Sequence, residues 1–230
     1  NRDRRDYTRA EMRRAIREVA ACFPVYRTYV VPAREEITDE DRACIAQATE
    51  CAKRGRQDVD AGLFDFIRDV LTMEVNGKKE SEFVLLFQQF TGPVMAKGVE
   101  DTAFYCYNRQ AGLNEVGNDP GRDGLSVEEF HAYCETMQAT HPLTMTTLAT
   151  HDTKRSDDVR ARLAVLSELP VRFGAAVQRW SRMNSIFRED GPGGATMPDR
   201  NTEYLYYQTL IGAWPLTLDR ASAYMLKAVR

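Results

Sequence analysis

The side chains best suited to chemistry in this chain are His151 and Asp152, which stand next to each other. Four threonines stand among the seven residues 144–150 before them, and Lys154 and Arg155 follow, just ahead of a helix-capping serine. The pattern predicts a strand, a polar corner and a helix. In a β/α barrel, catalytic side chains lie at the C-terminal ends of the strands. A carboxylate held there can stabilise positive charge on a sugar ring while the imidazole binds its hydroxyls, although a charged surface turn explains the same residues.

Residues 92–120 form a second candidate site. This segment places many hydrogen-bonding side chains among aromatic and small residues. Sugars offer hydroxyl edges and apolar faces together, so the mixture suits a carbohydrate subsite. A helix with a solvated charged side explains the pattern as well. The side chains concerned are Lys97, Glu100, Asp101, Tyr105, Tyr107, Asn108, Arg109, Asn114 and Glu115.

Other patterns that could form a catalytic or metal site are incomplete. Glu128 and His131 have the spacing of a di-iron helix, but no second copy of the motif exists. Cys44 and Cys51 share a predicted helix face and are most simply buried small hydrophobes. His131 and His141 have no partners at the spacing that zinc requires, and no glycine-rich phosphate loop occurs. We therefore expect no metal and no cofactor.

The composition is that of an ordinary globular protein of 230 residues, 43% of them hydrophobic and 28% charged. The net charge is −3, and the Lys and Arg residues are scattered, which argues against a nucleic-acid or anionic-membrane partner. No apolar run is long enough to span a bilayer. Five cysteines without a CxxC motif suit the reduced cytoplasm. The missing initiator Met and the end inside an apparent helix predict a piece of something larger.

Helical periodicity dominates the chain. Thr8, Thr38 and Ser126 are N-cap residues of predicted helices, the last with Glu129 in a capping box. Apolar residues at 63–71 recur every three or four positions, which is typical of an amphipathic helix. Further helices are expected at 99–107, 156–169, 170–188, 200–214 and 217–230.

Few segments have the composition of a strand. Besides 144–150, residues 25–31 are rich in β-branched and aromatic side chains. An apolar helical pattern at 83–90 is expected to end at Gly92 and Pro93. The balance predicts a mainly α fold with one barrel strand at about 144–150 and a second, short candidate at 25–31. One barrel strand cannot close a barrel, so this chain would hold a single strand and its helical surroundings.

Several stretches of the sequence resemble one enzyme family. The two that carry most of the resemblance read MAKGVEDTAFY at 95–105 and TMTTLATHDTKRSDDVRARLAVLSELP at 144–170. The others are YNR at 107–109, LNEVG at 113–117, RDYTRAEMRRAIRE at 5–18 and DRNTEYLYYQTLIGAWPL at 199–216. Together they run along essentially the whole chain and are similar to maltooligosyl trehalose synthases, intramolecular transglucosylases of the α-amylase superfamily. Cys106 departs from the arginine expected between two tyrosines, and Asn118 from a second glycine.

The resemblance implies that the chain is an internal piece of an enzyme with a catalytic (β/α)8 barrel. It places 1–142 in a helical insertion before the seventh barrel strand, 143–155 at that strand and its catalytic corner, and 156–230 in a second helical segment. The whole chain could also form one compact unit. The nucleophilic aspartate and the acid/base glutamate would lie upstream of the first residue, and the eighth strand beyond the last.

The resemblance also implies a reaction and residue roles. Asp152 would stabilise the transition state, and His151 would bind substrate hydroxyls. The reaction converts the reducing-end α-1,4 linkage of a maltooligosaccharide into an α,α-1,1 (trehalosyl) linkage. The glucan and the rest of the parent chain would be the partners. Further substrate contacts are expected from Lys154, Arg155, Lys97, Glu100, Tyr105, Tyr107, Asn108 and Glu115.

Two other classes of function remain open from the residues alone. A helical metal-dependent phosphohydrolase could use His151 and Asp152 as a metal-binding dyad, although such dyads lie on helices and need further His and Asp ligands. A non-catalytic helical interaction module is the third interpretation. Metal analysis, and glucan binding with and without Asp152, would distinguish these readings from the transglucosylase.

Overall fold

Side-chain caps begin three of the helices that the sequence predicts. In the computed structural model, which describes residues 6–122 and 124–229, each cap side chain accepts a hydrogen bond from the backbone three residues later. The residue at that third position bonds back to the cap backbone, which completes a capping box. The three pairs are Thr8 with Glu11, Thr38 with Asp41, and Ser126 with Glu129. Local sequence alone therefore determines where these helices start.

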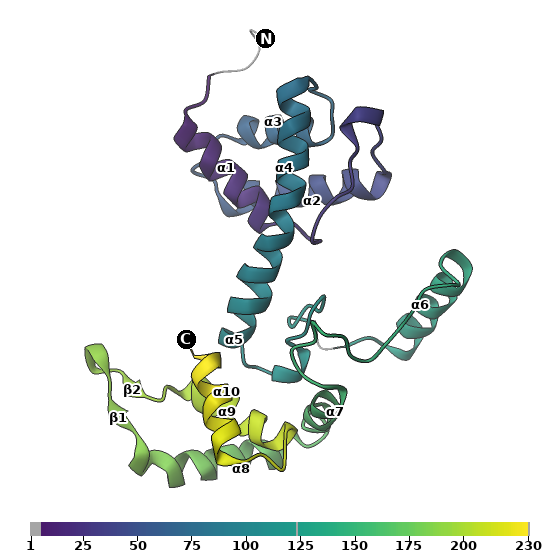
Figure 1. Ribbon diagram of the computed structural model, residues 1–230. Coiled ribbons are helices and arrows are strands. Elements are labelled where there is room, and N and C mark those ends of the chain that lie inside the picture. The colour runs from purple at the N-terminus through teal and green to yellow at the C-terminus, as the bar shows by residue number, and fades with distance from the viewer. Residues whose placement is uncertain (1–5, 123, 230) are drawn as a thin grey trace. The chain divides into compact units, whose positions relative to one another are not determined.

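The elements fall into two units, divided between Thr102 and Ala103 (Figure 1). The predicted mainly α fold is confirmed, because helices make up most of the elements in the described residues. The division between the units differs from the predicted boundaries at 142 and 155. Those boundaries describe positions around a barrel and stay a prediction. None of the helices in the described ranges has the length and apolar character that a membrane span requires.

Unit 1 is a bundle of helices around one apolar core. Its helices are α1 (Arg9–Ala21), α2 (Asp39–Gly55), α3 (Ala61–Leu71) and α4 (Lys78–Val94), with a short 3₁₀ turn at Pro32–Arg34. The predicted stripe at 63–71 supplies much of the core, and each large apolar side chain buried there contributes about 1.5–3 kcal/mol. The core side chains include Ala15, Val19, Phe23, Ile45, Ala48, Leu63, Phe64, Ile67, Val84 and Phe87.

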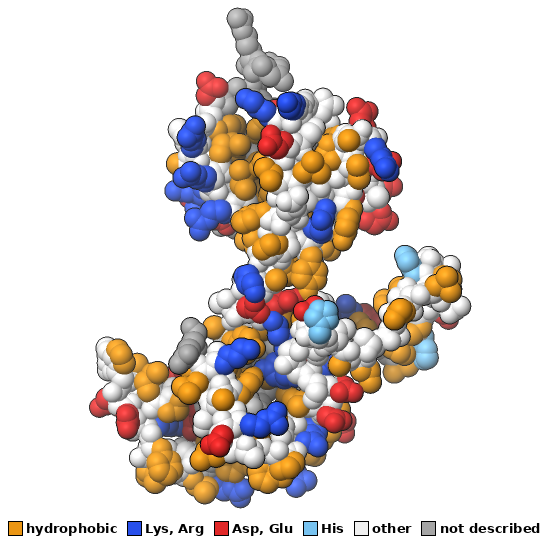
Figure 2. Space-filling view, in the orientation of Figure 1, with side chains coloured by type: hydrophobic (Ala, Val, Ile, Leu, Met, Phe, Trp, Pro, Cys, Tyr) orange, Lys and Arg blue, Asp and Glu red, His pale blue; other side chains and the backbone are white. Residues whose placement is uncertain are grey.

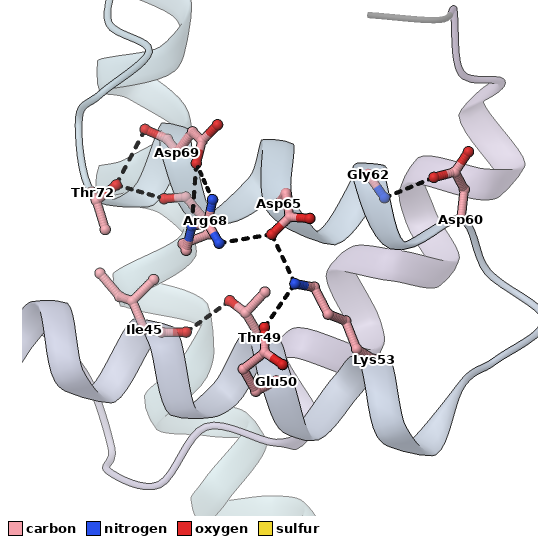
Figure 3. Close-up of polar contacts among 10 residues, drawn as sticks. All are labelled: Ile45, Thr49, Glu50, Lys53, Asp60, Gly62, Asp65, Arg68, Asp69 and Thr72. Carbon is pink, nitrogen blue, oxygen red and sulfur yellow. Dashed lines mark hydrogen bonds and ion pairs between the residues drawn. The ribbon is translucent and has the colours of Figure 1, made fainter.

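Polar side chains join α2 to α3 beside this core (Figure 3). Lys53 Nζ lies 2.8 Å from Asp65 Oδ1 on α3 and 2.7 Å from Glu50 Oε1 on its own helix. Arg68 Nη1 lies 2.7 Å from the same Asp65 oxygen. The pairs are partly exposed, and exposed ion pairs contribute about 0–1 kcal/mol each, so apolar packing carries most of the stability.

The predicted strand at 25–31 is wrong. Residues 25–30 have an irregular backbone, and Val31 makes an isolated bridge to Glu36. A side chain takes the place of a neighbouring strand, because Gln88 on α4 pairs with the backbone of Val30. Its Oε1 accepts from Val30 N at 2.7 Å, and its Nε2 donates to Val30 O at 3.0 Å. A composition rich in β-formers made the segment extended without making it part of a sheet.

The predicted end of the helix at Gly92 and Pro93 is also wrong. Helix α4 runs through Pro93 to Val94 and continues as a π-helix over Met95–Ala103. Proline removes one backbone hydrogen bond from a helix, and π turns are a known way for a helix to continue with altered spacing. The helix expected at 99–107 is therefore formed partly by these π turns.

Unit 2 consists of shorter elements. Its helices are α5 (Phe104–Cys106), α6 (Val127–Thr140), α7 (Asp157–Val165), α8 (Pro170–Met183), α9 (Arg200–Gly212) and α10 (Leu218–Ala228). 3₁₀ turns occur at Ala111–Leu113, Asn184–Phe187 and Pro192–Gly194. Helices α7 and α9 pack closely at Gly212, where an added Cβ would lie 2.8 Å from Val159 Cγ1. On the face that Figure 2 shows, Lys and Arg side chains are interspersed with acidic and hydrophobic ones in both units.

The predicted strand at 144–150 is wrong in this chain. The segment is irregular, and the apolar side chains of Leu143, Met145 and Leu148 are exposed. A strand needs a neighbour to pair its backbone groups, and within the described residues the named strands are β1 (Glu189–Asp190) and β2 (Thr196–Met197), which pair with each other.

Candidate functional site

The predicted catalytic pair lies at the tip of a threonine turn. Thr150 N donates to Thr153 Oγ1 at 2.6 Å, and Asp152 N donates to Thr150 Oγ1 at 3.2 Å. His151 Nε2 is 3.4 Å from Asp152 Oδ2, and their side chains are 91% and 69% exposed. Short polar side chains thus shape the corner, and both functional groups point into solvent, where they are free to meet a ligand.

Residues on both sides of the pair are tied down. Arg160 on α7 donates through Nη2 to the carbonyl of Leu148, ahead of the corner. Behind it, the backbone N–H groups of Lys154 and Arg155 donate to the buried carboxylate of Glu115, at 2.6 and 3.0 Å. The structure therefore joins the two segments that the sequence singled out.

The segment carrying Glu115 is fixed by buried amide side chains. Asn114 Nδ2 donates to the carbonyls of Phe104 and Tyr107, at 2.8 and 2.7 Å. Asn108, also buried, donates to the Tyr105 carbonyl at 3.2 Å. In both residues it is the amide nitrogen that makes these bonds, and its two hydrogens allow Asn114 to donate to two carbonyls. Asn108, predicted to bind substrate, makes these contacts to the protein itself.

Arg155 is a second predicted substrate residue that contacts the protein. Its guanidinium donates to Asn114 O at 3.3 Å and to the Tyr224 hydroxyl, on α10, at 3.2 Å. The Arg155 side chain therefore links the corner to the segment that carries Asn114 and to α10. Tyr105 is partly exposed and Tyr107 exposed, so these two rings remain available to a ligand.

Lys97 and Glu100, two further predicted substrate residues, lie on the π-helix over Met95–Ala103. Both belong to unit 1. Lys97 Nζ lies 2.5 Å from Asp101 Oδ2, one helical turn away, and Glu100 is buried and accepts from the Tyr26 hydroxyl. Their assignment as substrate residues stays a prediction.

Sequence reasoning missed Gln208, which organises the segment from α9. Its Oε1 accepts from Ala111 N at 2.7 Å, and its Nε2 donates to Asn108 O at 2.8 Å. The signal was a polar residue at helical spacing between Leu205 and Gly212, both buried. A buried glutamine on an apolar helix face needs backbone partners, so its position could have indicated this contact.

Unit 2 also contains a groove of about 1010 Å³ between α8, α9 and α10. Its lining is mostly apolar, and its buried Glu203 accepts from Ser181 Oγ at 3.1 Å, Tyr207 OH at 2.8 Å and Arg188 Nη2 at 2.6 Å. Burial by itself would raise the pKa of Glu203, but the hydrogen bonds from Tyr207, Arg188 and Ser181 outweigh it and leave the pKa lowered. The polar groups there serve one another.

Comparisons with known proteins support one family. A protein of Mycobacterium tuberculosis provisionally named maltooligosyl trehalose synthase is 39% identical over 150 residues, which cover 62% of this chain and 18% of that protein. The structure of the maltooligosyltrehalose synthase of Arthrobacter ramosus is similar over 95% of this chain, with a TM-score of 0.76 and 36% sequence identity. The matched part is 26% of the Arthrobacter ramosus chain. The resemblance to maltooligosyl trehalose synthases is confirmed. No family model matches the chain.

The chain is also similar in structure to a second solved protein, with a lower sequence identity. The solved protein of Sulfolobus tokodaii, described as hypothetical, matches 94% of this chain and 26% of its own, with a TM-score of 0.66 and 29% identity. The chain thus spans about a quarter of these solved maltooligosyl trehalose synthases and about a fifth of the curated relative.

Proposed function

We propose that this chain is part of an intramolecular transglucosylase that converts the reducing-end α-1,4 linkage of a maltooligosaccharide into an α,α-1,1 linkage, in trehalose biosynthesis. The observation that carries the proposal is the match over 95% of the chain to the Arthrobacter ramosus enzyme, at 36% identity and a TM-score of 0.76. The contact between Glu115 and the corner at Lys154 and Arg155 adds support, because it connects two of the segments that resemble the family, 113–117 and 144–170.

In this proposal Asp152 is the third carboxylate of a retaining mechanism. Such chemistry needs a nucleophile and an acid/base roughly 5 Å apart and passes through an oxocarbenium-like transition state. Asp152 accepts hydrogen bonds from ring hydroxyls, which favours a distorted ring and offsets the developing positive charge. His151 binds a neighbouring hydroxyl. The nucleophile displaces the terminal glucose and forms a glycosyl-enzyme, while the acid/base protonates the leaving oxygen. The glucose then turns over in its subsite, the acid/base takes the proton of its anomeric hydroxyl, and that oxygen attacks the glycosyl-enzyme and releases the nucleophile.

The exposure of the pair sets a requirement on the rest of the enzyme. A carboxylate that is 69% exposed interacts weakly with a developing charge, because water screens it. We propose that barrel strands from elsewhere in the parent chain pair with 144–150 and cover the corner. Residues 92–120 would help close the leaving-group subsite, since entry of water there would give hydrolysis in place of transfer.

The proposal assigns the nucleophile and the acid/base to parts of the enzyme outside residues 1–230, so this chain alone should be inactive. The test incubates maltopentaose with the chain alone and, separately, with a longer protein that contains it. A trehalosyl end has no reducing group, so reducing ends disappear as product forms. Product from the longer protein only is the expected result. Product from the chain alone would contradict the assignment of catalytic parts, and none from either would refute the function.

The alternative functions gain no observation in their favour. A phosphohydrolase needs more ligands than His151 and Asp152, and the described residues contain no group of three or more His, Cys, Asp or Glu side chains placed to hold a metal ion. Metal analysis of the purified chain tests this alternative, and a stoichiometric divalent ion would support it. A cytoplasmic location and the lack of a nucleic-acid, membrane or cofactor partner stay predictions.

A further inference from the structure

The carboxylate of Glu115 is aimed at backbone. The residue is 8% exposed, and both of its side-chain oxygens accept hydrogen bonds from main-chain N–H groups. Oε1 accepts from Lys154 N at 2.6 Å and from Val116 N at 3.0 Å, and Oε2 accepts from Arg155 N at 3.0 Å. A carboxylate that receives three main-chain donors inside the protein is poorly placed to receive sugar hydroxyls.

The contact is reciprocated between the same two segments. While Glu115 binds the backbone at Lys154 and Arg155, the Arg155 side chain donates back to the carbonyl of Asn114, at 3.3 Å. Hydrogen bonds to a charged group are roughly twice as strong as neutral ones. The two contacts therefore fix both the position and the orientation of the chain, two and three residues after Asp152.

We propose that Glu115 is a positioning residue, which holds the corner so that His151 and Asp152 face the substrate, and that it does not itself bind substrate. The catalytic consequence rests on the proposed function, whereas the structural clamp does not. Electrostatic stabilisation needs its groups held close to the productive geometry, and a shift of 1 Å can cost about 100-fold in rate. The threonine turn shapes the tip of the corner, and Glu115 attaches that turn to the rest of unit 2.

Amide hydrogen exchange of this chain tests the clamp directly. In Glu115→Gln, one side-chain oxygen becomes an NH₂ group of the same size. Whichever way the glutamine side chain is turned, this NH₂ donor then faces the backbone N–H of either Lys154 or Arg155, and that hydrogen bond is lost. Exchange at Lys154 or Arg155 should then accelerate by about 10- to 100-fold. Glu203→Gln is the matched control, because it removes another buried carboxylate of unit 2. Glu203 accepts hydrogen bonds from side chains of α8, α9 and Arg188, and from neither Lys154 nor Arg155. Unchanged exchange in Glu115→Gln, or equal acceleration in the control, overturns the proposal.

Kinetics of a longer protein that contains the chain test the consequence. Glu115→Gln should lower kcat by about 100-fold while KM stays within about twofold, since positioning acts on the transition state and direct binding acts on both. Glu129→Gln, at an exposed capping box, should leave both constants unchanged. A rise in KM with kcat unchanged would assign Glu115 to substrate binding and overturn the proposal. Inactivity of the unaltered protein would refute the proposed function, and the exchange result would still decide whether the clamp exists.

Discussion

Replacing Gln88 by Met should destabilise unit 1 far more than a single surface change would. Gln88 is 1% exposed, and it satisfies both the N–H and the C=O of Val30, at 2.7 and 3.0 Å. Methionine has nearly the same length and volume, so the apolar packing changes little. The substitution leaves one buried donor and one buried acceptor without a partner, which isolates the effect of the two hydrogen bonds.

The expected cost follows from those two orphaned groups. An unsatisfied buried backbone group costs about 1–3 kcal/mol, so the pair costs about 2–6 kcal/mol. A buried thioether costs less to desolvate than a buried amide, which offsets part of this loss of stability, and water that reached Val30 would offset more. We expect a net loss of about 2–4 kcal/mol in the free energy of unfolding. For a unit of about 100 residues, each kcal/mol lowers Tm by about 4–8 °C.

The assay is urea unfolding of the whole chain, followed by circular dichroism, together with amide exchange at Val30. Gln89 supplies the matched control, because it is the same residue type at the next position of α4 and is exposed. Gln89→Met should change stability by less than about 0.5 kcal/mol. If Gln88→Met and Gln89→Met behave alike, the side chain does not replace a strand partner for Val30, and the explanation of the failed strand is wrong.

Three further predictions concern unit 2. Gly212→Ala should lower the free energy of unfolding by about 1–3 kcal/mol, because the new Cβ would lie 2.8 Å from Val159 Cγ1. Gly174→Ala, whose new Cβ would meet no neighbouring atom within 4 Å, should stabilise its helix by up to about 1 kcal/mol. Thermal melts that rank the two variants in the opposite order would contradict the packing of α7 against α9. The pKa of Glu203 is lowered in the folded chain, so the charged carboxylate stabilises the fold above its unfolded pKa, and this stabilisation is lost as the pH falls below about 4. In Glu203→Gln, the free energy of unfolding should therefore fall less steeply with acid than in the unaltered chain. Equal slopes of unfolding free energy against pH in the two proteins would count against the lowered pKa. In the longer enzyme, Asp152→Asn should reduce kcat by several orders of magnitude with little change in KM, and an equal change in both would mean that Asp152 acts in ground-state binding.

Local sequence determined the features whose causes are local. The capping boxes at Thr8, Thr38 and Ser126 need only a side chain and the backbone three residues on, and all three formed. The stripe at 63–71 was readable because helical spacing alone puts those residues on one face. The polar corner at His151 and Asp152 is likewise built by neighbouring threonines, and it forms without any strand before it.

Tertiary structure decided everything that depends on a distant partner. Residues 25–31 and 144–150 have the composition of strands, yet a strand exists only where another segment pairs its backbone. Gln88, 58 positions from Val30, took that place for the first segment, and none of the named strands in the described residues did so for the second. Glu115 looked like a ligand of substrate, because its type and neighbours suit sugars. Only the fold, which brings the amides of residues 39 and 40 positions away to its carboxylate, turned it towards the backbone.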